Sequence, residues 1–63
     1  MFVTLHKTNA RRDDLGTLDL LPDTVTSLED GPTGDTLLTL RDKRTFLVRG
    51  TRVEILTTLR GAS

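Results

Sequence analysis

The 63-residue chain contains no cysteine, tryptophan or tyrosine, and its single histidine is His6. It therefore cannot form a disulfide, and a structural zinc site would lack most of the Cys or His ligands it needs. A chain this short buries only about 60% of its unfolded surface. Without a disulfide or a metal its own core is marginal, so we expect self-association to supply further buried area.

The sequence also lacks a long apolar segment. No run approaches the roughly 20 residues that a membrane-spanning helix requires, and the N-terminus does not have the charged-then-apolar layout of a secretion signal. We therefore expect a soluble protein without a membrane span. Its expected location is the cytoplasm, or a virion if a phage encodes the chain.

The chain also has no net charge, because its nine basic and nine acidic residues cancel. Such a chain has no overall field that would draw it onto nucleic acid or an anionic membrane. The charges are nevertheless unevenly distributed: residues 1–34 hold three basic and six acidic groups, and residues 35–63 hold six basic and three acidic ones. Two copies could stack head to tail, or both sets could simply be solvated.

Threonine is abundant, with twelve positions, and it alternates with Leu, Val or Phe along much of the chain. Alternation of β-branched and apolar residues with a period of two predicts strands. Short turn-forming segments separate these stretches and favour antiparallel neighbours. We expect one mainly β domain over residues 1–63, an antiparallel meander of four to five strands, barrel-like or open, with strands near 2–8, 15–20, 24–29, 35–41 and 44–49.

After Gly50 the pattern changes to helical spacing. The apolar residues there are Val53, Ile55, Leu56 and Leu59, with Leu56 three residues from Val53 and Leu59 three from Leu56, as on one face of a helix. Thr51 and Glu54 stand in the relation of a capping box. These features predict a short C-terminal helix over residues 51–60, ended by Gly61. A strand through 53–56 is the competing prediction, because Val, Ile and Thr also suit sheets.

Strand alternation assigns residues to the two faces of the expected sheet. The residues that we expect to point inward are Val3, Leu5, Leu38, Leu40, Phe46 and Val48. Leu37 and Leu47 then lie outside as neighbours, and a contiguous apolar patch of this kind indicates an interface. We include Phe2 and Arg49 in this predicted interface.

Catalytic and metal-binding patterns are weak. The paired acids Asp13-Asp14 and Glu29-Asp30 both sit in predicted turns, where Asp is favoured because its side chain bonds the local backbone. His6 has no Ser, Cys or Asp pattern that indicates a triad. The segment 31–34 lacks the Lys-Ser/Thr of a phosphate loop and predicts a hairpin turn. We therefore expect no enzyme, and no catalytic, cofactor-binding or metal-binding residue.

The C-terminal half contains a concentration of cations: Arg41, Lys43, Arg44, Arg49, Arg52 and Arg60. Phe46 is the only aromatic residue nearby, whereas binders of single-stranded nucleic acid interleave several aromatics with their cations. A solvated face or an acidic protein partner is the favoured interpretation. The alternative is a small nucleic-acid-binding regulator that uses Arg41, Lys43, Arg44 and Arg52.

Several pieces of the chain occur in the order seen in a known family. These pieces are Leu21-Pro22-Asp23, residues 25–29, residues 35–40, Asp42-Lys43-Arg44, residues 46–48 and Glu54-Ile55-Leu56. In this order the sequence resembles the small flagellar FlbD-like family over about three quarters of its length. The resemblance implies a β-meander with a short helix, an accessory role in a larger apparatus, and no catalytic residues.

These observations together predict a non-enzymatic assembly module. We expect it to form homo-oligomers through the Leu37 and Leu47 face or by adding edge strands, and to dock on a larger protein assembly. A phage virion component, such as a capsid-decorating or connector protein, and a flagellar accessory protein are the specific versions. No cofactor and no small-molecule substrate are expected.

Overall fold

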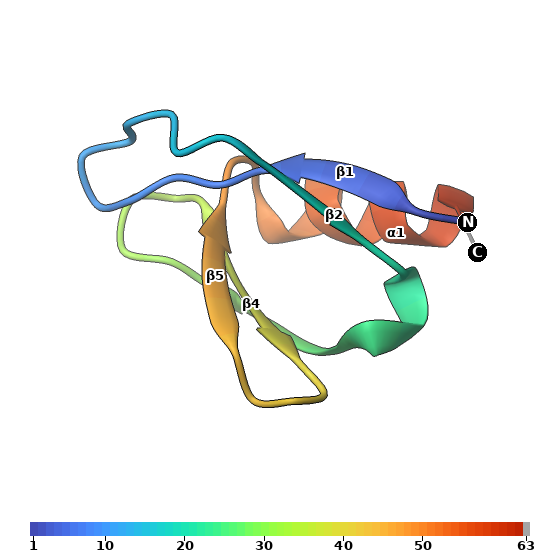
Figure 1. Ribbon diagram of the computed structural model, residues 1–63. Helices are drawn as coiled ribbons and strands as arrows, with labels where there is room; N and C mark the ends of the chain where they lie inside the picture. Colours follow the sequence, from blue (N-terminus) through green and yellow to red (C-terminus); the bar gives the residue numbers. More distant parts are fainter. Residues whose placement is uncertain (63) are drawn as a thin grey trace.

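The computed structural model describes residues 1–62 and is mainly β, with one short C-terminal helix (Figure 1). Along the chain the elements are β1 (Val3–His6), β2 (Thr17–Leu20), the 3-10 helix η1 (Pro22–Thr24), β3 (Val25–Asp30), β4 (Thr36–Leu40), β5 (Thr45–Val48) and α1 (Arg52–Ala62). The predicted antiparallel meander with one helix is confirmed, and so are all five predicted strands. Most are shorter than predicted, and the sheets do not close into a barrel.

The strands form two antiparallel sheets, β1-β2 and β3-β4-β5. A bridge between Lys7 and Val48 connects the sheets, because the chain after β1 runs along the edge of β5. Backbone hydrogen bonds from Thr8 N–H to the Leu47 carbonyl and from Arg49 N–H to the His6 carbonyl, both 2.8 Å, flank this bridge. The order of neighbours is therefore β2, β1, β5, β4, β3, with β2 and β3 at the two ends.

Two hairpin turns of the same type define the three-stranded sheet. The β3–β4 turn is closed by Gly31 N–H to the Asp35 carbonyl at 2.7 Å, which confirms the hairpin predicted for residues 31–34. The β4–β5 turn repeats this pattern, with Leu40 N–H donating to the Arg44 carbonyl at 2.9 Å. The residue before the closing position has a positive φ in each turn, 86° at Gly34 and 70° at Lys43. This is the three-residue loop that ends in a left-handed residue.

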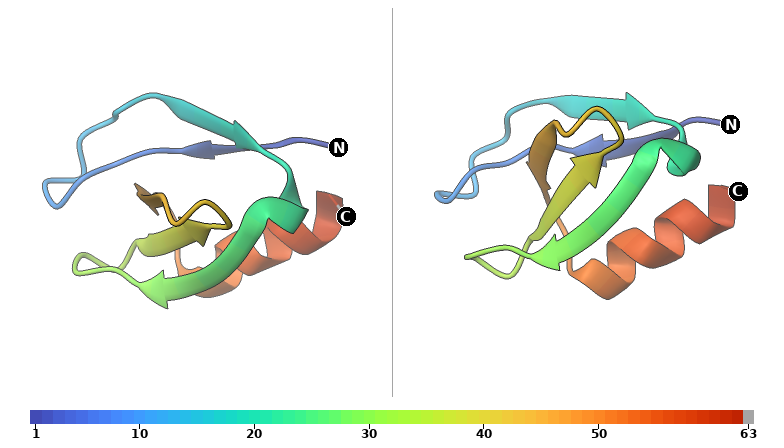
Figure 2. Two further views of the ribbon diagram at one scale, coloured as in Figure 1. Left: turned by 60° about the horizontal axis from the view of Figure 1, so that its bottom comes forward. Right: turned by 90° about the horizontal axis from the view of Figure 1, so that it is seen from below.

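A core of eight buried apolar side chains lies between the sheets and α1: Val3, Leu5, Leu20, Leu38, Leu40, Val48, Ile55 and Leu59. Five of the six residues expected to point inward are among them. The sixth, Phe46, packs against this core and is only half-buried. Helix α1 lies alongside β3 on the inner side of the sheet, as the two views of Figure 2 show.

The helix itself agrees with the prediction, and the competing strand over 53–56 is wrong. The Thr51 hydroxyl accepts the Glu54 N–H at 3.2 Å, as expected for an N-cap. Two details differ from the prediction. The helix continues past Gly61 to Ala62. Of the four apolar residues assigned to one face, only Ile55 and Leu59 are buried, whereas Val53 is 70% exposed and Leu56 is 39% exposed.

Candidate interaction surfaces

Leu37 and Leu47 are directly opposite each other on the outer face of the β3-β4-β5 sheet. They alternate with the buried Leu38 and Val48, so their side chains project from the face opposite to the core. The prediction that they are neighbours on this face is confirmed. Each is half-buried. Leu47 lies against Gly31, where a Cβ would come within 2.7 Å of the Leu47 Cδ1 atom.

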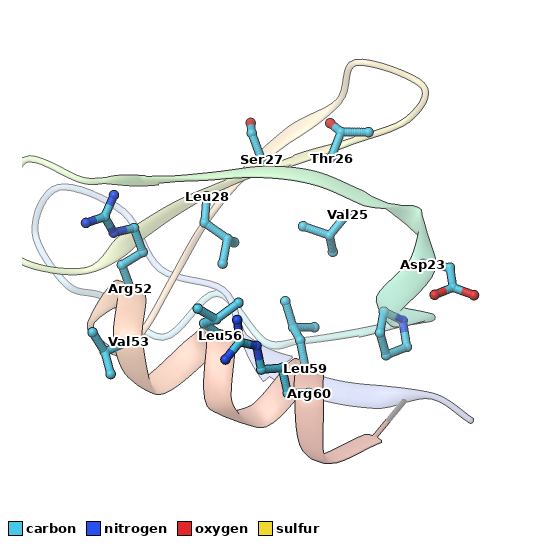
Figure 3. A pocket seen from close by; sticks show the side chains of 11 residues that line it. Asp23, Val25, Thr26, Ser27, Leu28, Arg52, Val53, Leu56, Leu59 and Arg60 are labelled. Atoms are coloured by element: carbon cyan, nitrogen blue, oxygen red, sulfur yellow. The ribbon is translucent and has the colours of Figure 1, made fainter.

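The rest of this outer face is almost free of charge. Its other residues, assigned from the strand register, are Thr26, Ser27, Glu29, Thr39 and Thr45. A β-bulge between Val25 and Ser27 turns two consecutive side chains outward, and Figure 3 shows Thr26 and Ser27 pointing away from the helix. The face therefore has two leucines at its centre, hydroxyl groups around them, and Glu29 as its single charged residue.

The two other predicted interface residues lie elsewhere. Phe2, which is 67% exposed, lines a cavity of about 400 Å³ together with Leu21, Arg41 and Arg44. Arg49 donates a hydrogen bond from Nη2 to the Arg12 carbonyl oxygen at 2.8 Å, so its guanidinium holds the 9–16 loop. The structure thus brings Leu37 and Leu47 together and places Phe2 with the basic hairpin.

That basic hairpin is the β4–β5 turn, which presents the exposed residues Arg41, Lys43 and Arg44. Arg44 Nε lies 2.6 Å from Asp42 Oδ2, and the Arg44 guanidinium lies 5.9 Å from the centre of the Phe46 ring. The Arg44 backbone N–H also donates to the Asp42 carboxylate. This hydrogen bond, together with the hydrogen bond and charge of the Arg44 guanidinium, lowers the pKa of Asp42. The fourth predicted cation, Arg52, lies apart at the start of α1, 3.7 Å from Asp30.

A groove between β3 and α1 is a surface that the sequence did not reveal. It has a volume of about 620 Å³, and its lining residues are Pro22, Asp23, Val25, Thr26, Ser27, Leu28, Arg52, Val53, Leu56, Leu59 and Arg60. In Figure 3, Val25 and Leu28 point from β3 toward the helix, and Leu56 and Leu59 face them. Helical periodicity finds these helix residues, but it does not show that β3 leaves part of them uncovered.

Sequence reasoning also missed Asp35, whose side chain is 2% exposed. Its carboxylate accepts hydrogen bonds from Gly50 N–H at 3.2 Å and from the Thr33 hydroxyl at 3.0 Å, and it forms an ion pair with Arg12 at 3.3 Å. Burial raises the pKa of Asp35, but these three partners outweigh it, so the pKa lies below its ordinary value. The site has the features of a structural connection between three loops.

The paired acids and His6 are distributed over turns and strands. Asp13 bonds the Asn9 side chain, and Asp14 accepts the Gly16 N–H. The prediction that Glu29 and Asp30 sit in a turn is wrong, because both are the last residues of β3 and pair with β4. His6 is exposed on β1. Within residues 1–62, no group of three or more His, Cys, Asp or Glu side chains is arranged to hold a metal ion. In the same range, no helix is long and apolar enough to cross a membrane.

Comparison with known protein families, with curated proteins and with solved structures found no match for this chain. The resemblance to the FlbD-like family therefore remains a prediction.

Proposed function

We propose that the chain is a non-enzymatic assembly module that self-associates through the outer face of its three-stranded sheet. The observation that carries this proposal is the opposed pair Leu37 and Leu47 on a face with only one charged residue. The charged share of this face is lower than the 29% of the whole chain. Interface centres are depleted in charged residues, and this face has that composition.

The partner that we propose for this outer face is the same face of a second copy of the chain. Two copies related by a two-fold axis present the same patch to each other, and leucines ringed by hydroxyl groups are complementary to themselves. Two sheets packed face to face in this way would bury Leu37 and Leu47 of both copies. A typical stable interface buries about 800 Å² per partner, which is about a fifth of the 4256 Å² surface of this chain. The outer face of three strands of four to six residues supplies only part of that area, so the turns around it would contribute the rest.

The setting of such a module is a separate part of the proposal. A small self-associating β domain suits a repeated component, such as a capsid-decorating or connector protein of a phage virion. An accessory protein of a flagellar apparatus is the other setting, and it rests on the FlbD-like pattern in the sequence. Either setting also requires docking on a larger protein assembly, for which a surface other than the self-association face must be free.

Light scattering of the purified protein over a range of concentrations tests the proposal. The variant Leu37→Asp with Leu47→Asp introduces charge at the centre of the outer face, and we expect it to convert a defined oligomer into a monomer. The matched control is Val53→Asp with Leu56→Asp, which makes two equivalent changes at the β3–α1 groove and leaves the oligomer intact. Circular dichroism establishes that each variant remains folded.

Two outcomes contradict the proposal. A wild-type chain that stays monomeric at millimolar concentration shows that the outer face does not self-associate. An oligomer that survives the Leu37 and Leu47 changes but not the Val53 and Leu56 changes assigns the interface to the groove instead.

A nucleic-acid contact at the β4–β5 turn is the second candidate function. The observation in its favour is that both phenylalanines of the chain lie beside the cations: Phe46 under Arg44, and Phe2 in the cavity that Arg41 and Arg44 line. Arginine and aromatic side chains together provide a platform for unpaired bases. Binding of a single-stranded oligonucleotide that falls steeply between 50 and 200 mM salt would support this function, whereas a leucine interface is insensitive to such a change.

A further inference from the structure

The free edge of β3 lies beside the β3–α1 groove. In an antiparallel pair, residues that exchange hydrogen bonds alternate with residues whose backbone groups point away from the partner strand. Gly31 and Asp35 form a hydrogen-bonded pair, so Glu29 and Leu37, two residues further along each strand, form one too. The neighbouring pairs, Leu28–Leu38 and Asp30–Thr36, do not exchange hydrogen bonds. The backbone N–H and C=O groups of Leu28 and Asp30 therefore point outward along the edge.

Apolar side chains lie directly below this edge. Leu28 is half-buried, and it points into the groove toward Leu56 on α1 (Figure 3). Leu56 and Val53 are exposed although they are large and apolar. A strand added to β3 would bond to Leu28, and its side chain at that position would share the face of Leu28. That side chain would enter the groove and cover the apolar surface of the helix.

The other side of the added strand would meet an acidic residue. Glu29 is exposed, and its side chain is on the outer face, because it alternates with Leu28 and pairs with Leu37. The incoming residue next to the one in the groove would therefore lie opposite Glu29. Opposite charges at such cross-strand positions are stabilising. A basic side chain is the complement at this position.

From this juxtaposition we infer that the β3 edge and its groove dock an extended segment of a partner protein, with an apolar side chain opposite Leu28 and a basic one opposite Glu29. This surface is distinct from the outer face through which the chain is proposed to self-associate. Main-chain bonds to Leu28 and Asp30 supply affinity, and the two side-chain positions supply specificity. The surface gives the module a way to attach to a larger assembly while its sheet face binds another copy.

A second copy of β3 is a poor occupant of this edge. The symmetric antiparallel register that bonds both Leu28 and Asp30 places Glu29 directly opposite the partner's Glu29, and like charges at this position are destabilising. It also places Leu28 opposite the partner's Asp30. The bulge between Val25 and Ser27 interrupts the ladder on the other side, so the strand cannot shift in that direction without losing bonds.

The test is an NMR titration of the isotopically labelled protein with two synthetic peptides. One is acetyl-Lys-Val-Lys-Val-Lys-Thr-amide, and the other has Glu in place of each Lys. We expect the lysine peptide to shift the amide signals of Leu28 and Asp30 and the methyl signals of Leu56. We expect it to bind about three- to fivefold more tightly than the glutamate peptide, as a favourable cross-strand charge pair implies.

Two substitutions make the test specific. Glu29→Lys lies at an exposed position and should reverse the preference between the two peptides. Asp30→Pro removes the outward N–H without removing a bond to β4, and it should abolish binding, while Asp30→Ala keeps that N–H and retains binding. The variant Leu37→Ser with Leu47→Ser removes the two outer-face leucines without adding charge beside Glu29. It should bind the lysine peptide as the wild type does, whether or not self-association at the outer face is correct.

Three results would overturn the inference. The first is an absence of shifts at Leu28 and Asp30 with either peptide. The second is a peptide preference that Glu29→Lys leaves unchanged. This result can be obtained even if the Asp30→Pro variant does not fold. The third is a shift of the Leu28 and Asp30 amide signals when the Leu37→Ser with Leu47→Ser variant is diluted without peptide. Because this variant lacks the outer-face leucines, such a shift would assign the edge to a second copy.

Discussion

The carboxylate of Asp35, the residue before β4, accepts a hydrogen bond from the backbone N–H of Gly50, two residues before α1, at 3.2 Å. Fifteen residues separate the two in sequence. Gly50 has a φ of 112°, a conformation that glycine adopts at little cost. The neighbouring Thr36 hydroxyl donates to the Gly50 carbonyl at 2.9 Å, so both backbone groups of Gly50 are held. This contact determines where the chain leaves β5 and therefore where α1 lies against β3.

Replacing Asp35 with Asn should destabilise the protein strongly. An amide cannot pair with the Arg12 guanidinium as an anion does, and its NH₂ group faces donors instead of acceptors. Loss of a buried charged acceptor of this kind costs about 2–3 kcal/mol in the free energy of unfolding. Urea denaturation measures the loss. The matched control Asp42→Asn, on an exposed ion pair, should have a much smaller effect. Equal losses in the two variants would contradict the structural role of Asp35.

The stability that Asp35 contributes should depend on pH with a definite sign. Its pKa in the folded protein is lowered from 3.8, so the carboxylate stabilises the folded state fully above that pH. The contribution falls as the pH drops below 3.8 toward the lower folded pKa, because the unfolded state, with its higher pKa, binds the proton first and is stabilised relative to the folded state. The difference in unfolding free energy between wild type and Asp35→Asn should therefore be constant from pH 5 to 7 and shrink below about pH 4. A difference that grows on acidification would have the wrong sign.

The fold was predictable from the sequence because its strands carry a local signal. Leu38, Leu40 and Val48 alternate with residues of the other face, and this period of two survives in the structure without a register shift over β4 and β5. The Thr51 cap likewise marked the start of the helix. Helical spacing identified α1 correctly, but it could not say which of its apolar residues would meet the sheet: Ile55 and Leu59 are buried, and Val53 is exposed.

The Asp35 network and the β3–α1 groove were not predictable, because neither has a local signal. The partners of Asp35 come from the 9–16 loop, from the β3–β4 turn and from the segment after β5, and only the tertiary fold brings them together. In sequence, Asp35 is an ordinary polar residue at the beginning of the strand predicted near 35–41. The groove depends on the position of α1 relative to the edge of β3, which follows from contacts across the core and not from the pattern of either element alone.

Substitution of two adjacent leucines tests the assignment of faces. Leu38 is completely buried, and removing its side chain with Leu38→Ala should cost about 2–5 kcal/mol in the free energy of unfolding. Leu37 is half-buried on the outer face, and Leu37→Ala should cost about 1 kcal/mol. Both are measured by urea denaturation at a concentration at which light scattering shows a monomer, so that loss of self-association does not contribute. A Leu37→Ala loss equal to or larger than that of Leu38→Ala would mean that the register of β4 is inverted.

The two turns of the same type provide a paired prediction about backbone strain. Lys43 occupies the left-handed position that Gly34 occupies in the preceding turn, with φ values of 70° and 86°. A side chain at this position costs free energy that glycine avoids, so Lys43→Gly should stabilise the protein by about 0.5–1 kcal/mol although it removes no packed group. Gly34→Ala should destabilise it by a similar amount, and because a Cβ at Gly34 would have no atom within 4 Å, that loss can only come from the backbone. Both changes are measured as shifts of the thermal midpoint in opposite directions, and shifts of the same sign would show that the two turns do not share a conformation.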